Sequence, residues 1–141
     1  YWLSTRLLTW FSHNILHAVP IERERTQLTS DPLATSCAAL EAGEILIFFP
    51  EGSRGEPEQF STFKAGLALL VERVPETQVI PVFLHGLGKT WPKGSGLFVP
   101  FFCHIQIGPP MQWDNNRRGF MKRYKAQMQQ LAAEGNFPPW E

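Results

Sequence analysis

Apolar and polar positions repeat with two different periods along the chain, and the change of period separates predicted strands from predicted helices. Apolar side chains run almost without interruption through residues 44–49, a pattern typical of a parallel strand buried on both faces of a sheet. Residues 78–84 form a second strong strand pattern, and residues 97–102 and 104–107 form shorter ones. The sequence therefore predicts several short strands, with a loop expected across residues 85–96.

Helical spacing alternates with these strands. Residues 33–42 follow Asp31, which stands where an N-cap belongs, and they end at Gly43. Residues 63–73 form a second helical segment between the two strongest strands. A longer one covers residues 114–133, where apolar side chains recur on one side and basic side chains on the other.

This alternation predicts an α/β fold, in which a mixed, largely parallel sheet carries helices on its faces. Residues 1–141 suffice for a single domain. Another amphipathic pattern, from Trp2 to Ile15, has no helix-start signal before it, and the first residue is Tyr1 rather than Met. We expect the domain to be incomplete at its N-terminus. The apolar side of the first segment is either core or a membrane-surface contact.

Charge narrows the choice of partners. Thirteen basic residues balance thirteen acidic ones, so bulk attraction of nucleic acid is not expected. No apolar run approaches the roughly 18 residues needed to cross a bilayer. Cys37 and Cys103 have no metal-ligand spacing and stand in apolar company, which favours two buried thiols in a reducing compartment. We expect no metal and no nucleic acid.

The candidate chemistry lies where predicted strands end, which is where open α/β sheets bind ligands. Arg23 follows a short extended segment, the polar loop 51–54 follows the strand 44–49, and Lys64 opens the next predicted helix. Guanidinium and ammonium groups suit phosphate, and backbone N–H groups at Gly52 and at a helix start favour an anion. The blander alternatives are a local Glu51–Arg54 ion pair and a solvated lysine that opposes the helix dipole.

Three segments carry a family resemblance in their order and spacing. They are Phe49-Pro50-Glu51-Gly52-Ser53-Arg54, then Phe63-Lys64-Ala65-Gly66, then Val79-Ile80-Pro81-Val82. Together they resemble the glycerolipid acyltransferase family, of the lysophosphatidate acyltransferase (PlsC-like) type. Upstream, Val19-Pro20-Ile21-Glu22-Arg23 is similar to the second block of that family, so the resemblance covers about residues 16–82.

The resemblance implies a set of site residues. Three cations would contact the phosphate of a lysophospholipid or glycerol phosphate, namely Arg23, Arg54 and Lys64. Glu51 and Gly52 would shape the acceptor pocket, and Pro81 would border the acyl site. The full predicted substrate-binding set is Arg23, Glu51, Gly52, Ser53, Arg54, Lys64, Gly66 and Pro81.

The resemblance also implies the reaction. In this family a histidine oriented by an aspartate deprotonates the acceptor hydroxyl, which attacks the thioester of acyl-CoA or acyl carrier protein, without a further cofactor. That catalytic block, His followed by four residues and Asp, is missing here. His17 and Glu22 have the same offset but lie on the second block, where the family has no base. We therefore expect the catalytic pair upstream and predict that the isolated chain is nearly inactive.

Two other functions remain as alternatives. A non-catalytic lysolipid- or phosphate-binding module would keep the pocket without the base. A phosphate-handling enzyme of another class is disfavoured, because the sequence has no Walker loop, dinucleotide-binding turn or carboxylate cluster for magnesium.

The expected partners are a lysophospholipid, an acyl thioester and a membrane surface, with the protein on the cytoplasmic face of a membrane. The basic side of the last helical segment has two interpretations: it meets anionic lipid, or it is a solvated helix face. Its basic residues are Arg117, Arg118, Lys122, Arg123 and Lys125.

Overall fold

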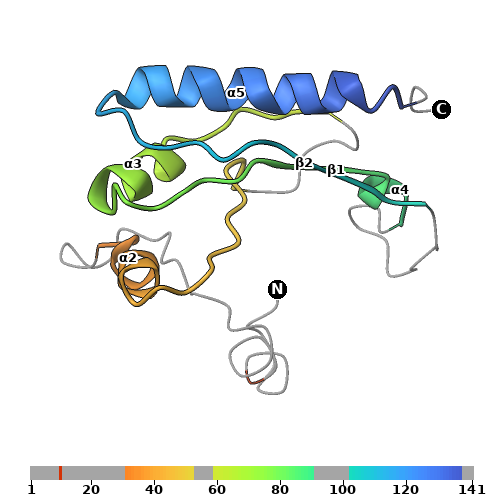
Figure 1. Cartoon of the computed structure of the whole chain (residues 1–141). Helices are drawn as coiled ribbons and strands as arrows, with labels where there is room; N and C mark the ends of the chain where they lie inside the picture. Colours follow the sequence, from red (N-terminus) through yellow and green to blue (C-terminus); the bar gives the residue numbers. More distant parts are fainter. Residues whose placement is uncertain (1–9, 11–30, 53–58, 91–101, 138–141) are drawn as a thin grey trace. The chain divides into compact units, whose positions relative to one another are not determined.

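The computed structural model describes Trp10 and residues 31–52, 59–90 and 102–137 (Figure 1). Contacts within the chain divide it into two compact units, residues 1–46 and residues 47–141. The predicted first helix lies outside the described residues except for Trp10, which is helical and exposed. The single domain stays a prediction.

In the first unit the described element is helix α2, Ala34–Glu41. The predicted N-cap at Asp31 is wrong, because the N-cap is Leu33, which has no side chain that could accept a capping bond. The Asp31 Oδ1 instead accepts from the Leu33 N–H at 3.1 Å and holds the chain just before the helix. Gly43 follows the last turn with φ +81°, the left-handed conformation in which helices commonly end. The predicted helix over residues 33–42 is confirmed, and Cys37 is buried on it.

The second unit is organised around the 18-residue helix α5, Arg117–Glu134. It contacts helix α3, Gly66–Arg73, and the strands β1, Val82–His85, and β2, His104–Ile107 (Figure 1). The predicted amphipathic helix is confirmed, because the side chains that face the core are the apolar ones. The buried core of this unit consists of Leu67, Ala68, Val71, Met111, Phe120, Tyr124, Met128 and Leu131.

Strands β1 and β2 pair antiparallel, with Val82 opposite Ile107 and His85 opposite His104. Phe83 packs against the core, whereas the neighbouring β1 side chains Val82 and Leu84 lie on the other face and are exposed. β2 confirms the strand predicted at residues 104–107. The described residues form only this antiparallel pair of strands, which does not test the largely parallel sheet, so that sheet stays a prediction.

The buried strand predicted at residues 44–49 is wrong. No strand is assigned there, and Ile45, Ile47 and Phe49 are 96%, 79% and 70% exposed. Phe48 alone packs against the core of the second unit. The segment thus has the alternating in-and-out pattern of extended chain. A continuous apolar run indicates a preference for burial, but burial on both faces requires a packing layer on each.

Three boundaries also differ from the predictions. The second helix begins at Gly66 rather than residue 63, with Ala65 as its N-cap, and the Lys64 N–H instead donates to the Pro50 carbonyl at 2.8 Å. The second strand begins at Val82 rather than residue 78, since Pro81 has no N–H to donate to a ladder. A short helix α4, Leu87–Thr90, stands inside the predicted loop.

Cys103 is exposed, so the prediction of two buried thiols is correct for Cys37 only. Its Sγ lies 3.4 Å from the Thr90 Oγ1. The apolar neighbours that suggested burial are themselves exposed, Phe102 to 92% and Ile105 to 64%.

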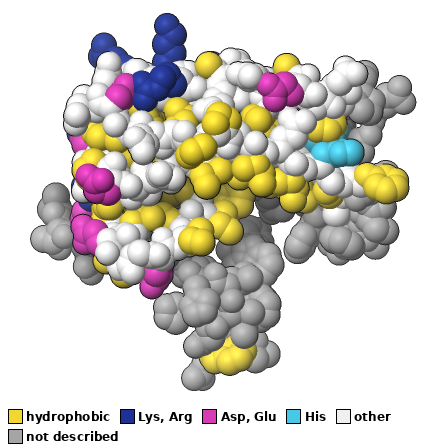
Figure 2. Space-filling model, viewed as in Figure 1, with side chains coloured by type: hydrophobic (Ala, Val, Ile, Leu, Met, Phe, Trp, Pro, Cys, Tyr) yellow, Lys and Arg dark blue, Asp and Glu magenta, His cyan; other side chains and the backbone are white. Residues whose placement is uncertain are grey.

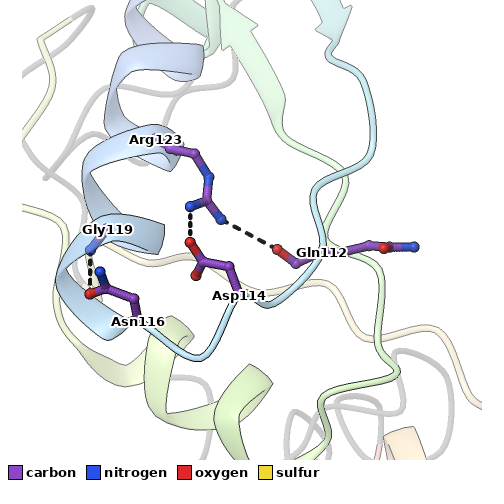
Figure 3. A network of polar contacts seen from close by, with 5 residues as sticks. All are labelled: Gln112, Asp114, Asn116, Gly119 and Arg123. Carbon is purple, nitrogen blue, oxygen red and sulfur yellow. Dashed lines mark hydrogen bonds and ion pairs between the residues drawn. The ribbon is translucent and has the colours of Figure 1, made fainter.

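Polar contacts fix the beginning of α5 (Figure 3). Asn116 is the N-cap, and its Oδ1 accepts from the Gly119 N–H at 3.0 Å. Arg123 pairs with the carboxylate of Asp114 and donates to the Gln112 carbonyl at 3.4 Å. The Arg123 guanidinium lowers the pKa of the Asp114 carboxyl by hydrogen bonding to it. The loop before the helix is therefore tied to the second helical turn.

We predict that Asn116→Ala lowers the free energy of unfolding by about 1 kcal/mol, because the Gly119 N–H loses its side-chain acceptor. Urea denaturation followed by circular dichroism measures the change. Gln129→Ala, an exposed change within the same helix, is the control. Equal stability losses in the two variants would contradict a capping role for Asn116.

Candidate functional site

The Phe49–Gly52 segment forms a tight turn at the entrance to the second unit. The Gly52 N–H donates to the Phe49 carbonyl at 3.0 Å, and Gly52 has φ +73°. This left-handed conformation favours glycine, since a side chain there would be strained. The Lys64 N–H bonds to the carbonyl of Pro50 inside the same turn. Two segments singled out from the sequence are thus joined by a backbone hydrogen bond.

The Lys64 side chain lies directly beside Gly52. A β-carbon placed on Gly52 would stand 3.3 Å from the Lys64 Cδ and 3.4 Å from its Nζ. The missing side chain at position 52 therefore leaves room for the aliphatic stem of the lysine. Lys64 is exposed, so its ammonium group is presented to solvent next to the turn. A compact cation at this place can bind a phosphate oxygen.

Glu51 is the acidic group of the turn. Its Oε2 accepts from the Ser61 N–H at 3.3 Å, which is a second link between the turn and the segment that leads into α3. Two residues further on, the Phe63 ring packs edge-on against the ring of Tyr124, with centroids 5.3 Å apart. The segment from Ser61 to Lys64 is thus held by the turn on one side and by α5 on the other.

Tyr124 is a core residue whose hydroxyl is affected by the charge of Glu51 in the turn. Its side chain is only 5% exposed. Burial raises the pKa of the Tyr124 hydroxyl to about 12, and the negative charge of Glu51 adds to the effect. The Glu51 carboxylate therefore lies close enough to the phenol of α5 to oppose its ionisation.

The structure places the predicted site residues as follows. Glu51, Gly52 and Lys64 come together at the turn. Gly66 is the first residue of α3 and lies against the Phe48 ring, where a β-carbon would be 3.4 Å from Cζ. Pro81 is fully buried before β1, and its carbonyl accepts from the Gly108 N–H at 2.8 Å.

Arg23, Ser53 and Arg54 lie outside the described residues. The convergence of three cations on one phosphate thus stays a prediction, because the structure describes the position of Lys64 but not of the two arginines.

Two details of the predicted anion site are wrong. The Gly52 N–H already donates to Phe49, so the turn itself uses the amide that was expected to face an anion. Lys64 does not open a helix, because α3 begins after the N-cap residue Ala65. Its charge therefore lies one residue before the N-cap and not in the first helical turn, where the alternative of a solvated lysine had placed it.

Sequence reasoning missed Ser61 and the role of Tyr124. Ser61 contributes a backbone N–H, which any residue except proline would supply, so no side-chain signal marks it. For Tyr124 the helical period indicates only burial on the apolar side of residues 114–133, and its proximity to Glu51 depends on how distant segments pack.

Within residues 31–52, 59–90 and 102–137, no group of three or more His, Cys, Asp or Glu side chains is placed to hold a metal ion. Among those same residues, no helix combines the length and apolar character needed to cross a membrane.

We predict that Glu51→Gln lowers the pKa of Tyr124 from about 12 toward 10.0, because it removes the nearby negative charge while burial remains. The chain has two tyrosines, so tyrosinate absorbance in a Tyr1→Phe background reports on Tyr124 alone. Glu76→Gln is the matched control and should leave the titration unchanged. An unaltered Tyr124 titration in Glu51→Gln would show that the two groups do not interact.

The same shift has a consequence for stability. The unfolded chain releases the phenol proton near pH 10.0, whereas the folded chain holds it to about 12. Folding stability is therefore expected to fall as the pH rises through this window, and Tyr124→Phe should remove that part of the alkaline loss. Urea midpoints measured across the window check this. Equal alkaline losses in the two proteins would contradict it.

Comparison with known proteins agrees with the motif order. The model of a family described as Acyltransferase matches residues 2–85. A chloroplastic 1-acyl-sn-glycerol-3-phosphate acyltransferase of Arabidopsis thaliana is 33% identical over 82 residues, which are 58% of this chain and 23% of that protein. A 1-acyl-sn-glycerol-3-phosphate acyltransferase of Pseudomonas aeruginosa is 31% identical over 99 residues, 69% of this chain and 37% of that protein.

The chain thus spans well under half the length of these relatives. No solved structure matches it significantly. The family match includes both the turn at Glu51 and the Lys64 segment that packs on it, and it extends over more than half of the chain. The chain belongs to the Acyltransferase family, among glycerolipid acyltransferases of the PlsC type.

Proposed function

We propose that this chain holds the acceptor-phosphate site of an enzyme that transfers an acyl group to the hydroxyl of lysophosphatidate in phospholipid biosynthesis. The observation that supports it most is the Lys64 ammonium beside the Gly52 turn. Family membership supplies the reaction class, and the local geometry supplies a group suited to the headgroup. The acyl donor is acyl-CoA or acyl carrier protein, which differ in the carrier but present the same thioester.

Lys64 and Glu51 have different tasks in this proposal. The lysine neutralises a phosphate oxygen, and a charge-assisted contact of this kind contributes roughly 1.5–3 kcal/mol. The carboxylate of Glu51 would repel the phosphate, so it faces the glycerol part, where a carboxylate can accept from a hydroxyl. Its bond to the Ser61 N–H fixes its position. Arg23 and Arg54 would complete the phosphate contacts, with Ser53 beside them.

The chemical step requires a base outside the described site. The acceptor hydroxyl loses its proton to the base, its oxygen bonds to the thioester carbonyl carbon, and the carbon–sulfur bond breaks to release the thiol. None of the four histidines has an aspartate five residues later. His85 and His104 instead pack on Phe137 at one end of the β1–β2 pair. The base would come from the catalytic block absent from these 141 residues.

A second candidate function is a lysolipid-binding module without turnover. It would use the same phosphate site, so phosphate binding alone does not separate the two functions. Both place the protein at a membrane surface, and we propose the cytoplasmic face. Acyl transfer by the complete protein separates them.

We predict that Lys64→Gln raises the KM for lysophosphatidate about tenfold in the complete enzyme, because one charge-assisted phosphate contact is lost. Monoacylglycerol, which has no phosphate, should be used equally well by the wild-type enzyme and by Lys64→Gln. Lys64→Arg should restore most of the affinity. Arg23→Ala and Arg54→Ala are expected to behave as Lys64→Gln does. Equal losses on both acceptors would rule out phosphate contact at these positions.

We further predict that the 141-residue chain alone binds lysophosphatidate but transfers acyl groups at least 10²-fold more slowly than the complete protein, because a positioned base contributes roughly 10²–10⁴ in rate. Isothermal titration calorimetry measures the binding, and thiol release from acyl-CoA measures the transfer. Comparable transfer rates would show that another group in this chain serves as the base. Slow transfer by the complete protein as well would favour the binding module.

A further inference from the structure

The outward side of α5 carries three cations in one row. Arg118, Lys122 and Lys125 are spaced by four and three residues, so they project from the same face of the helix. All three are exposed. Figure 2 shows dark-blue side chains gathered over the N-terminal half of α5. From the rise of a helix, the row is about 10 Å long. We call these three residues the α5 cation row.

The other two cations of α5 are engaged differently. The Arg117 Nε donates to the Glu72 Oε2 at 2.7 Å, and Arg123 pairs with Asp114. Their charges are thus balanced by carboxylates on the same unit. In the described part of the chain, no ion pair involves a member of the α5 cation row. Helix α5 has no acidic residue before Glu134. Local positive charge therefore remains although the whole chain is neutral.

The opposite side of α5 makes the row rigid. Phe120, Tyr124, Met128 and Leu131 are buried in the core, so the helix cannot rotate without exposing them. The Asn116 cap and the Arg123–Asp114 pair hold the N-terminal end of the helix, where the row begins. Three unbalanced cations are thus presented together on one firmly packed face.

We propose that the α5 cation row is the surface by which this protein contacts an anionic phospholipid bilayer. The inference rests on the proposed function, because an enzyme acting on lysophosphatidate must meet a lipid surface that carries phosphate groups. The charge of the row complements such a surface. Each cation near an anionic leaflet contributes about fivefold in binding, so three contribute on the order of a hundredfold. A bilayer fits a row of three cations on a chain of zero net charge better than a nucleic acid does, since nucleic-acid binding needs many phosphate contacts.

The test is co-sedimentation of the full chain with vesicles of phosphatidylcholine alone or with about 30 mol% phosphatidylglycerol. The wild-type chain should bind the anionic vesicles more tightly. The triple variant Arg118→Gln, Lys122→Gln, Lys125→Gln should lose on the order of a hundredfold of that preference. The charge-preserving triple variant Arg118→Lys, Lys122→Arg, Lys125→Arg should retain it. Glutamine is a good helix former, and circular dichroism verifies the fold.

A second control uses the balanced pair. Arg117→Gln combined with Glu72→Gln leaves the net charge unchanged and should bind anionic vesicles like the wild type. The proposal is overturned if the glutamine triple variant keeps its preference for anionic vesicles, or if the charge-preserving variant loses it as well. Row-dependent binding of duplex DNA without vesicle binding would also overturn it.

Failure here is distinguishable from failure of the proposed function. A short-chain lysophosphatidate that stays monomeric reports on the Lys64 site without a bilayer. The glutamine triple variant should bind it as tightly as the wild type. Intact binding of that monomer together with row-independent vesicle binding would refute the α5 surface alone. If the wild type does not bind the monomeric short-chain lysophosphatidate, the proposed headgroup site is refuted.

Discussion

Burial of one side of α5 is the constraint on which the second unit depends. Phe120, Tyr124, Met128 and Leu131 leave water only if α3 and the two strands pack against the same helix. Phe48 joins this packing, and the Gly66 position lies against its ring. The chain directly after Phe48 must therefore turn at a fixed place beside the start of α3. The Glu51–Gly52 turn owes its position to this hydrophobic contact together with the hydrogen bonds from the Lys64 and Ser61 N–H groups.

The same packing links chemistry on the two sides of one helix. On its inner side, Tyr124 packs against Phe63 and lies close to the charge of Glu51, so α5 supports the turn. On its outer side, α5 carries the basic residues. A helix that supports the Lys64 site on one side and contacts a bilayer on the other would hold the headgroup-binding site at a defined distance from the lipid surface. This geometry suits an enzyme whose acceptor has a polar head and an acyl chain.

Predictions from sequence succeeded where a local signal decides the structure. The helix over residues 33–42 was found although its predicted N-cap was wrong, since Gly43 marks its C-terminal end, and α5 was found from the period of its buried side chains. They failed where a tertiary partner decides. The apolar run 44–49 was expected to be buried, yet only Phe48 meets the core. Lys64 was placed in a helix, although its N–H bonds instead to Pro50, a long-range contact that no helical period can reveal.

The candidate site shows the same division. Motif order located Glu51, Gly52 and Lys64, and the structure brings these three together. The most direct test of the central claim is a crystal structure of the chain with bound lysophosphatidate. We expect the phosphate within hydrogen-bonding distance of the Lys64 ammonium, with the glycerol beside Glu51. A phosphate bound elsewhere, with the Lys64 side chain directed into solvent, would contradict it.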